Sequence, residues 1–576
     1  RAVRSTAHGL LARLRLCPPP PSRPPLLRGA ADPGAYWAWC RARGPSAPRR
    51  YGAASARCRG KGRGHSPLFS VLVPVCDPRA QWLHDCIGSV RSQTIGCWEL
   101  ILCDDASRDA GVRAALQQAA SGDPRIRAVL RRERGGISRA TDGGARRARG
   151  AYLVFLDHDD MLDPFALAAF AQALQAESKP PDVLYADEDR FDDDYRCFWP
   201  GFKPGFSSDR LLATNYIHHP VAMRRAFFDS LGGLRPEFDG SQDHDLLLRA
   251  EEAGARFVHV PDVLYHMRLH EGSLVSGPQA KPEAHKRDRA LIADALQRRG
   301  IEATVEPLPE RPGLHVIRRR MPVDAAVSVL AVMADPAGRS ELSELERDRW
   351  QGGEVLPVVA GDEGLVHALN EAARRAAGDV LLITTADAEP ASGWREAVVP
   401  NALREDIGLV TGKLVALDGT LIACGLVLGM AGAAGRWHHG CTADEPSYGG
   451  WIEVQHDVSA VPWRLLAVKR SLFLAAGGFD EDFSAGGFDV DLALRLTRAH
   501  GRRHLAVPHL RVTAAHRATE RGRADEARLW ERWGDVIRAG DPCFNPNLGL
   551  LNEGTSFVDD DEDGLRAKGV SWQPGR

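Results

Sequence analysis

From Leu68 onward, short apolar runs alternate with longer stretches of helical character. The apolar runs predict strands, and residues 83–94 and 109–120 are predicted to be helices. The predicted strands are FSVLVPV (69–75), WELILC (98–103), IRAVL (126–130), AYLVFL (151–156) and DVLYA (182–186). Because strands that alternate with helices form βαβ units, the pattern predicts an α/β fold with a mostly parallel, Rossmann-like sheet.

The pattern occurs twice along the chain. Four blocks return in the same order, and the paired segments are 69–78 with 327–336, 141–160 with 369–388, 223–238 with 468–483, and 243–249 with 489–495. Such repetition predicts two tandem copies of one domain. Asp77 and Asp157 are 80 positions apart, whereas Asp335 and Thr385 are 50 apart. The second copy is therefore predicted to be abbreviated by about one strand–helix unit, in the half that usually binds the nucleotide in such folds.

A chain of 576 residues exceeds the roughly 250–300 residues at which single cores stop growing. We expect a leader at residues 1–66, domain 1 at 67–300, a linker at 301–325, a degenerate domain 2 at 326–540 and a tail at 541–576. The linker contains PLPERPG and the tail contains the acidic run DDDED.

Charge distinguishes the leader from the rest. It holds fourteen Arg or Lys residues against one acid, Asp32, and includes the proline-rich run PPPPSRPP. This composition predicts a disordered segment, with a transit peptide and contact with anionic lipid as the alternatives.

The remaining composition is that of a globular protein that is not integral to a membrane, because no uncharged run approaches the roughly 18 residues of a membrane-spanning helix. Eleven cysteines without a CxxC pair argue against a disulfide framework or a structural zinc site. We therefore expect a cytoplasmic protein, with peripheral contact at the cytoplasmic face of the membrane left open, and no nucleic-acid partner.

Acidic residues follow three predicted strands directly: Asp77, the pair Asp104 and Asp105, and the cluster 157–160. Ligands bind at the carboxyl ends of strands in open α/β sheets, so these acids are expected to converge. Converging carboxylates repel unless a cation lies among them, and oxygen ligands favour Mg²⁺ or Mn²⁺ together with substrate phosphates. The alternative is a polar loop that caps the next helix, but three such clusters favour the metal site.

Three further side chains are candidates, each with a structural alternative. Arg139, after the Gly135-Gly136 turn, is suited to contact phosphate or to lie on an exposed arginine face. Asp243 is placed in the first turn of a helix, where a carboxylate can act as a general base or cap the helix. His266 is suited to complete the metal site or to be a structural histidine.

Several motifs together resemble a known family. In the first copy they are SVLVPVCDP, CDDAS, FLDHDD, YADED, FKPGFSSD, NYIHH, SQDHDLLLR and YHMR, and in the second KLVALDGTLIACGLVLG, VSAVPWRLLAVKRSLF, GGFDEDF and DPCFNPNL. From Leu68 to about Phe557 the chain resembles a tandem family 2 glycosyltransferase with two GT-A domains, like bacterial enzymes that build O-antigen and other surface polysaccharides.

This resemblance implies a role for each candidate residue. Asp77, Asp104 and Asp105 correspond to positions that contact the base and ribose of the nucleotide-sugar, with Arg139 also assigned to nucleotide-sugar binding. Asp157 and Asp159 form the DxD motif that holds metal and diphosphate. Asp243 corresponds to the general base, although Gln242 rather than Glu precedes it, and His266 corresponds to a third metal ligand.

The implied activity is an inverting, metal-dependent transfer from a UDP-, GDP- or dTDP-sugar to a hydroxyl of a growing, polyprenyl-linked polysaccharide. In the second copy Thr385 replaces the first DxD aspartate, so we expect that copy to be inactive or specialised for acceptor binding. A non-catalytic scaffold that binds nucleotide-sugar or glycan is the alternative. A phosphatase fits poorly because no later lysine motif is present.

Overall fold

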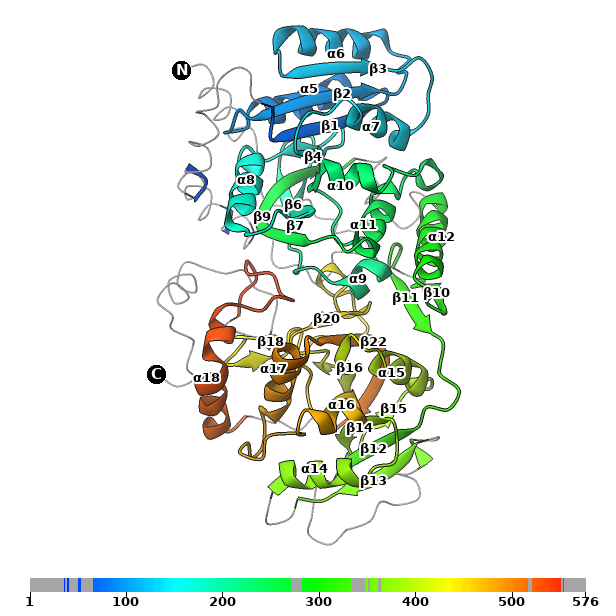
Figure 1. The fold of residues 1–576 in the computed structure, drawn as a ribbon, viewed down its shortest axis with the longest axis vertical. Helices are drawn as coiled ribbons and strands as arrows, with labels where there is room; N and C mark the ends of the chain where they lie inside the picture. Colours follow the sequence, from blue (N-terminus) through cyan, green and yellow to red (C-terminus); the bar gives the residue numbers. More distant parts are fainter. Residues whose placement is uncertain are drawn as a thin grey trace. The chain divides into compact units, whose positions relative to one another are not determined.

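The computed structural model describes residues 36, 39–40, 50–52, 66–270, 282–309, 311–333, 348–350, 353–360, 364–515, 521–550 and 553. The chain divides into two compact units (Figure 1). Unit 1 comprises residues 1–206, 215–299 and 309–313, and unit 2 comprises residues 207–214, 300–308 and 314–576. Most of the predicted leader, the acidic run 559–563, Asp335 and His516 lie outside the described residues.

Unit 1 is built on one mixed sheet with strand order β3-β2-β1-β4-β8-β6-β9-β5 and with β7 paired to β6. The strands are β1 (Phe69–Val75), β2 (Trp98–Asp104), β3 (Ile126–Leu130), β4 (Tyr152–Phe155), β5 (Met161–Leu162), β6 (Val183–Phe191), β7 (Cys197–Gly201), β8 (Val221–Arg224) and β9 (Phe257–Arg268). Strands β3, β2, β1 and β4 are parallel, as the βαβ pattern predicts, whereas β8 runs antiparallel to β4 and β6. All five strands predicted in this copy are present.

Helices cover both faces of this sheet. They are α5 (Ala80–Arg91), α6 (Ala110–Gly122), α7 (Ile137–Ala145), α8 (Ala166–Ala176), α10 (Arg225–Ser230), α11 (Gln242–Glu252) and α12 (Pro282–Arg298), with the short η3 (Pro236–Phe238) before α11. Val71 and Val73 of β1 are fully buried in a core that includes Leu83 of α5. Leu72 points to the opposite face, where α7 packs so closely that a Cβ on Gly144 would overlap Cys103. Burial on both faces explains why these strands are continuous apolar runs.

Unit 2 repeats the same arrangement in a sheet that also has nine described strands, but seven of them rather than eight lie on the main path. Its order is β13-β12-β14-β21-β16-β22-β15, with β17 on β16 and β20 on β22. The strands are β12 (Val327–Val332), β13 (Glu354–Val358), β14 (Val380–Thr385), β15 (Glu389–Pro390), β16 (Ile407–Ala416), β17 (Leu421–Ala423), β20 (His456–Val458), β21 (Leu465–Lys469) and β22 (Arg503–Ala514). The strand without a counterpart is β3, which confirms two tandem α/β domains with the second abbreviated.

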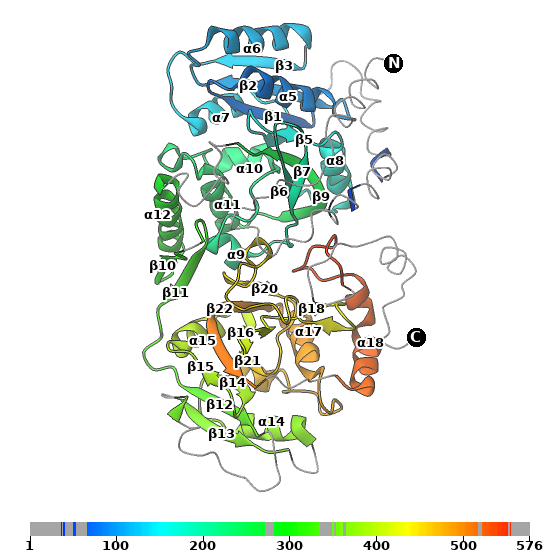
Figure 2. The same ribbon diagram turned by 180° about the vertical axis from the view of Figure 1, so that it is seen from behind.

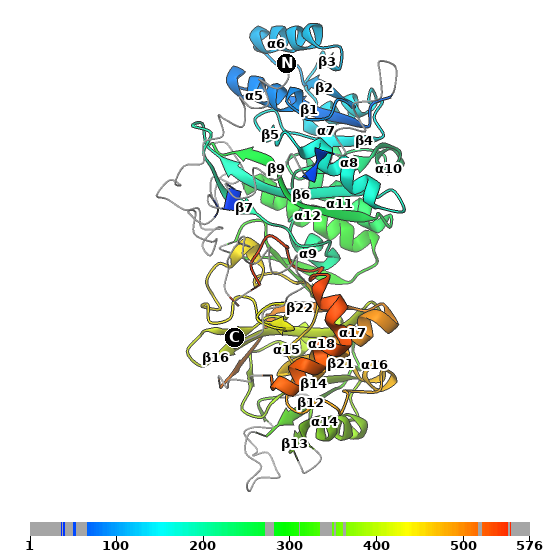
Figure 3. The same cartoon turned by 90° about the vertical axis from the view of Figure 1, so that its left-hand side faces the viewer.

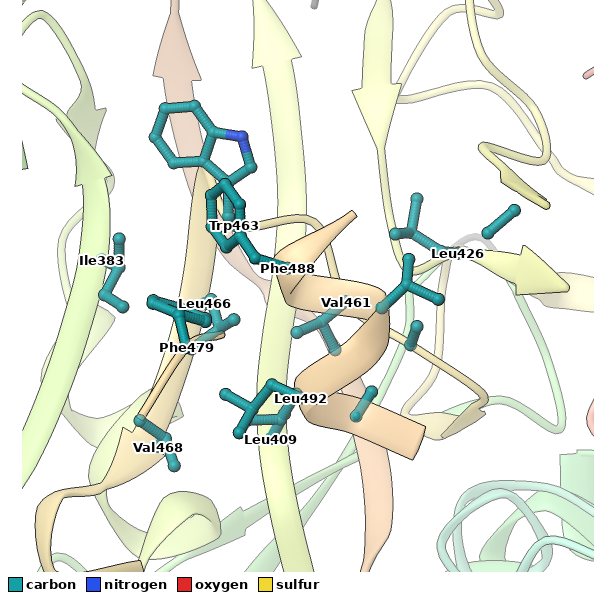
Figure 4. Close-up of a cluster of buried hydrophobic side chains, with 14 of the residues drawn as sticks. Ile383, Leu409, Leu426, Val461, Trp463, Leu466, Val468, Phe479, Phe488 and Leu492 are labelled. Carbon is teal, nitrogen blue, oxygen red and sulfur yellow. The ribbon is translucent and has the colours of Figure 1, made fainter. Parts of the chain in front are cut away.

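One core cluster of unit 2 lies between its sheet and α17 (Phe488–His500), and a second includes residues of the sheet and of α15 (Trp394–Ala402). Figure 4 shows Phe488 and Leu492 of this helix facing Leu466 of β21 and Leu409 of β16. The other helices are α9 (Ser208–Ala213), α14 (Gly364–Arg375), α15 (Trp394–Ala402), α16 (Arg470–Ala475) and α18 (Arg523–Arg538), with the short η5 (Tyr448–Gly450). Helix α15 packs on β16 and β22 (Figure 2), and α18 lies beside α17 (Figure 3).

The segment expected to be a linker is partly folded. It contains the antiparallel hairpin of β10 (Ala303–Pro307) and β11 (His315–Arg319), whose ladder runs from Ala303 opposite Arg319 to Pro307 opposite His315. A further two-stranded ladder joins β18 (Val427–Leu428) to β19 (Ala434–Gly435). None of the described helices combines the length and apolar character needed to cross a membrane.

Helix α9 joins unit 2 through a buried charge cluster. Asp209, which is almost fully buried, accepts hydrogen bonds from Arg404 (2.6 Å and 3.0 Å) and Arg503 (2.9 Å). Burial acts to raise the pKa of Asp209, but the two guanidinium groups outweigh it and lower that pKa. These ion pairs connect a helix encoded within the first repeat to β22 and to the loop between α15 and β16 in the second.

Candidate functional site

The carboxyl ends of β1, β2 and β4 bring the predicted acids to one edge of the unit 1 sheet. Val75, near the end of β1, lies opposite Asp104 at the end of β2. Phe155 at the end of β4 lies opposite Leu72. Since the three strands are parallel neighbours, the loops that carry Asp77, Asp105 and Asp157 all leave the sheet at this edge.

Asp77 organises the loop after β1. Its carboxylate accepts hydrogen bonds from the N–H groups of Arg108 (2.6 Å) and Asp109 (3.2 Å), and it forms an ion pair with Arg134. Burial acts to raise the pKa of Asp77, and these hydrogen bonds and the arginine together lower it. Asp77 is therefore held as a carboxylate that ties three loop segments together.

Asp104 and Asp105 are both buried. Asp104 accepts a hydrogen bond from the N–H of Ser107 and lies 3.3 Å from Nε of Arg113. Asp105 accepts hydrogen bonds from the N–H groups of Gly135 (2.9 Å) and Gly136 (2.8 Å). Gly136 has φ +87°, and a Cβ there would meet the carboxylate of Asp239, so the Gly-Gly turn is required for this contact.

Arg139 lies on the exposed side of α7. Its guanidinium has no ion-pair partner among the described residues. The structure thus leaves Arg139 accessible near the acidic edge, and its assignment to nucleotide-sugar binding stays a prediction.

The three aspartates of DHDD lie in different surroundings. The Asp157 side chain is 40% exposed and lies 3.6 Å from Nε2 of His219. The Asp159 side chain is 22% exposed, and Nε2 of His270 lies 3.0 Å from its Oδ2. Asp160 is buried and accepts hydrogen bonds from the Tyr265 hydroxyl and the Arg268 N–H, both 2.7 Å. Asp160 anchors the loop, whereas Asp157 and Asp159 are accessible to a ligand.

Burial and the neighbouring charges shift the pKa values of these acids in different directions. Burial raises the pKa of Asp157, with Asp159 raising it further and His219 lowering it. Burial, followed by Asp159 and Asp157, raises the pKa of Asp160 well above its usual range. Burial acts on Asp159 too, but the hydrogen bond from His270 lowers its pKa. A divalent cation would relieve this repulsion, so the carboxylates and imidazole present fit Mg²⁺ or Mn²⁺.

His266 lies in a separate group of ligand-type side chains. Its Nδ1 lies 2.7 Å from Oδ1 of Asp189, and with Cys197 these residues form the one group of three ligand-type side chains within 4.8 Å of one another in the described part of the chain. Asp189 contacts His266 because β6 and β9 pair in a parallel register that places these two residues opposite each other. His266 thus contacts Asp189, and its assignment as a metal ligand beside Asp157 and Asp159 stays a prediction.

His270, four residues later, lies beside Asp159. Strand β9 ends at Arg268, and the chain then reaches the Asp159 carboxylate. The sequence contained a signal for it, because YHMRLH carries two histidines and only the second lies beyond the strand.

Asp243 is in the first turn of α11, as predicted. Nδ2 of Asn215 donates a hydrogen bond to its Oδ2 (2.9 Å). Asp243 and Asp157 line one cavity, together with His218 and His219 and an apolar floor that includes Leu72. The structure thus brings Asp243 to Asp157, and it adds three residues from the NYIHH motif that sequence reasoning left without a role.

The equivalent region of unit 2 differs in the residues that the structure describes after β14 and in α17, whereas most of the loops after β12 and β13 lies outside the described residues. Thr385 ends β14, and Asp387 accepts a hydrogen bond from the N–H of Ala515 (3.1 Å). Asp489, the counterpart of Asp243, accepts one from the N–H of Trp463 (2.9 Å). Asp491 is buried against Trp533, as Asp245 is against Arg249 in unit 1. No group of three ligand-type side chains forms in the described residues of unit 2.

In comparisons with known proteins, the family match falls within the first repeat. Residues 70–232 match the model of the family described as Glycosyl transferase family 2. The PGL/p-HBAD biosynthesis glycosyltransferase of Mycobacterium bovis (strain BCG / Pasteur 1173P2) is 30% identical over 206 residues, which are 35% of this chain and 77% of that protein.

Two relatives match most of the chain. The uncharacterized protein y4gI of Sinorhizobium fredii (strain NBRC 101917 / NGR234) is 32% identical over 541 residues, 86% of this chain and 59% of its own length. The O-antigen biosynthesis protein RfbC of Myxococcus xanthus is 33% identical over 590 residues, 94% of this chain and 44% of its own length. The chain thus spans about half the length of these two relatives.

Proposed function

Since this chain belongs to glycosyltransferase family 2, we propose that unit 1 transfers a sugar from a nucleotide-sugar to a hydroxyl of a growing surface polysaccharide. The observation that carries the proposal is the cavity lined by both Asp157 and Asp243. It supports a reaction in which a donor diphosphate and an acceptor hydroxyl meet between the two carboxylates. The name of the Myxococcus relative supports an acceptor of the O-antigen type.

The residues of the site fall into two groups in this proposal, one for the nucleotide and one for the metal. Asp77, Asp104 and Asp105 shape the edge that receives the base and ribose, and Arg139 approaches the phosphates. Asp157, Asp159 and His270 would hold a divalent cation, Mg²⁺ or Mn²⁺, which would supply Lewis-acid neutralisation of the diphosphate. His270 thereby replaces His266 as the third ligand.

Asp243 is the general base. It accepts the proton of the acceptor hydroxyl while the hydrogen bond from Asn215 keeps its carboxylate oriented. With one base facing the donor, attack is opposite the leaving group and the anomeric configuration inverts.

The acceptor is proposed to be polyprenyl-linked, so the reaction would take place at the cytoplasmic face of the membrane. The nine cysteines described are all unpaired, which suits a reducing compartment.

The test is release of nucleoside diphosphate from UDP-, GDP- and dTDP-sugars with Mn²⁺ and polyprenyl-linked acceptor. Asp243→Asn should reduce release by about a thousandfold or more while donor binding persists. Asp229→Asn, an exposed acid of α10, is the matched control and should be fully active. Tight donor binding without turnover for every pair would favour the non-catalytic scaffold instead.

A further inference from the structure

Unit 2 contains a cavity of about 460 Å³ beside Asp489. This volume lies in the range of small-molecule sites, which is about 300–1,000 Å³. Asp489 is the counterpart of Asp243, so the cavity lies on the side of the fold where unit 1 is proposed to receive the acceptor hydroxyl. Figure 4 shows Trp463, Phe488 and Leu426 in this region, and Trp463 and Leu426 line the cavity.

The walls of this cavity combine fixed polar groups with an apolar surface. Arg436 and Glu553 form a two-pronged ion pair (3.0 Å and 3.1 Å), and Arg521 pairs with Glu526 (2.8 Å). Asp489 is only 6% exposed, and the Trp463 N–H fixes its orientation. The guanidinium and carboxylate groups of these residues are thus fixed before a ligand binds. This limits the side-chain entropy that is lost on binding.

The chemistry of the cavity argues against a nucleotide diphosphate. Thr385 takes the place of the first DxD aspartate, and no counterpart of β3 is present among the described strands. Three acids line the cavity with four arginines, and Glu553 and Glu526 already pair with two of these arginines. A diphosphate would therefore compete with carboxylates for the guanidinium groups.

A saccharide matches these walls. Neighbouring hydroxyls both donate and accept hydrogen bonds, so they suit carboxylate and guanidinium groups placed side by side. The C–H faces of a sugar ring suit the apolar wall formed by residues such as Leu414 and Trp463.

We propose that this cavity binds a saccharide residue of the acceptor glycan and performs no transfer. The identification of the saccharide as acceptor rests on the proposed function of unit 1. The second domain then retains the acceptor half of the ancestral site while the donor half is lost. Its role is to hold the growing chain.

The test uses saturation-transfer NMR with the full chain, without donor or metal. The probes are the methyl glycosides of glucose, galactose, mannose, N-acetylglucosamine, rhamnose and glucuronic acid. At least one should receive saturation from the protein. Ala434→Trp, which fills the cavity, should abolish the signal.

A milder pair of variants keeps the test decisive if Ala434→Trp fails to fold. Arg523 is exposed and lines the cavity, and Arg523→Ala should weaken binding by about tenfold through loss of one charged hydrogen bond. Arg538→Ala, at the other end of α18 and outside the cavity, should bind as the parent does.

Three results would overturn the inference. The first is that none of the six glycosides receives saturation, and the second is that the glycoside signals are unchanged in both Ala434→Trp and Arg523→Ala. The third is that the signals are lost in Asp157→Asn, which would place the binding site in unit 1. Failure of the proposed function looks different, because nucleotide release would be absent while glycoside binding to unit 2 persists.

Discussion

Nε2 of His270 lies 3.0 Å from Oδ2 of Asp159, although 111 positions separate the two residues. This contact distinguishes His270 from His266, whose Nδ1 is occupied by Asp189. Two histidines of one short motif thus serve different acids, one at the accessible edge and one inside the sheet.

Replacing His270 should weaken metal binding. His270→Ala removes one proposed ligand, so the Mn²⁺ concentration for half-maximal activity should rise by about tenfold or more. Direct Mn²⁺ binding, followed by electron paramagnetic resonance, should weaken in parallel. His84→Ala, an exposed histidine of α5, is the control. An unchanged Mn²⁺ affinity in His270→Ala would remove this residue from the site.

Asn215 should act by orienting Asp243. Asn215→Ala loses the 2.9 Å hydrogen bond to the base but leaves its carboxylate in place. We expect kcat to fall by about tenfold, with the KM for donor unchanged, because the interaction serves the proton transfer. A rise in donor KM at constant kcat would contradict a positioning role.

Unit 2 should lose stability in mild acid because it buries neutral histidines. His504 accepts a hydrogen bond at Nδ1 from the Leu409 N–H and donates from Nε2 to the Ala493 carbonyl, which fixes the neutral ring. Burial lowers the pKa of His504 to about 4 and that of His456 to about 3, from 6.5. Their neutral forms therefore contribute stability above pH 6.5, and this contribution is lost as the pH falls towards 4.

The size of this effect follows from proton linkage. Each such histidine adds a slope of about 1.4 kcal/mol per pH unit to the free energy of unfolding in this window. Hydrogen exchange of α17 and β22 reports on unit 2 alone, and its opening free energy should decrease accordingly below pH 6.5. His504→Gln can keep both hydrogen bonds but cannot titrate. It should reduce the slope of the free energy of unfolding against pH by about 1.4 kcal/mol per pH unit. An identical slope in this variant would contradict the assignment.

The buried Asp209 should be costly to neutralise. Asp209→Asn removes the buried carboxylate that Arg404 and Arg503 share, and we expect a loss of about 3 kcal/mol in the free energy of unfolding. This loss is expected although both arginines keep their pair with the half-exposed Asp406. Thermal unfolding measures this change. Glu302→Gln breaks only the exposed pair with Arg320 and should change stability by less than about 1 kcal/mol. Equal effects of the two substitutions would show that burial does not matter here.

The sequence by itself determined the architecture. Strands β1 to β4 are short apolar runs because they are buried on both faces, and the repeat revealed the second domain with its missing strand. Acids that directly follow parallel strands had to reach one edge, so the placement of Asp77, Asp105 and Asp157 was predictable from chain order.

Only the tertiary structure decided which side chains meet at the site. The strand pattern does not reveal that β6 and β9 pair in the register that joins Asp189 to His266, or that His270 turns towards Asp159. Nor does local pattern show that α9, inside the first repeat, pairs with arginines of the second. These contacts depend on register and on long-range closure of the chain, whereas hydrophobic periodicity records only which face of an element is buried.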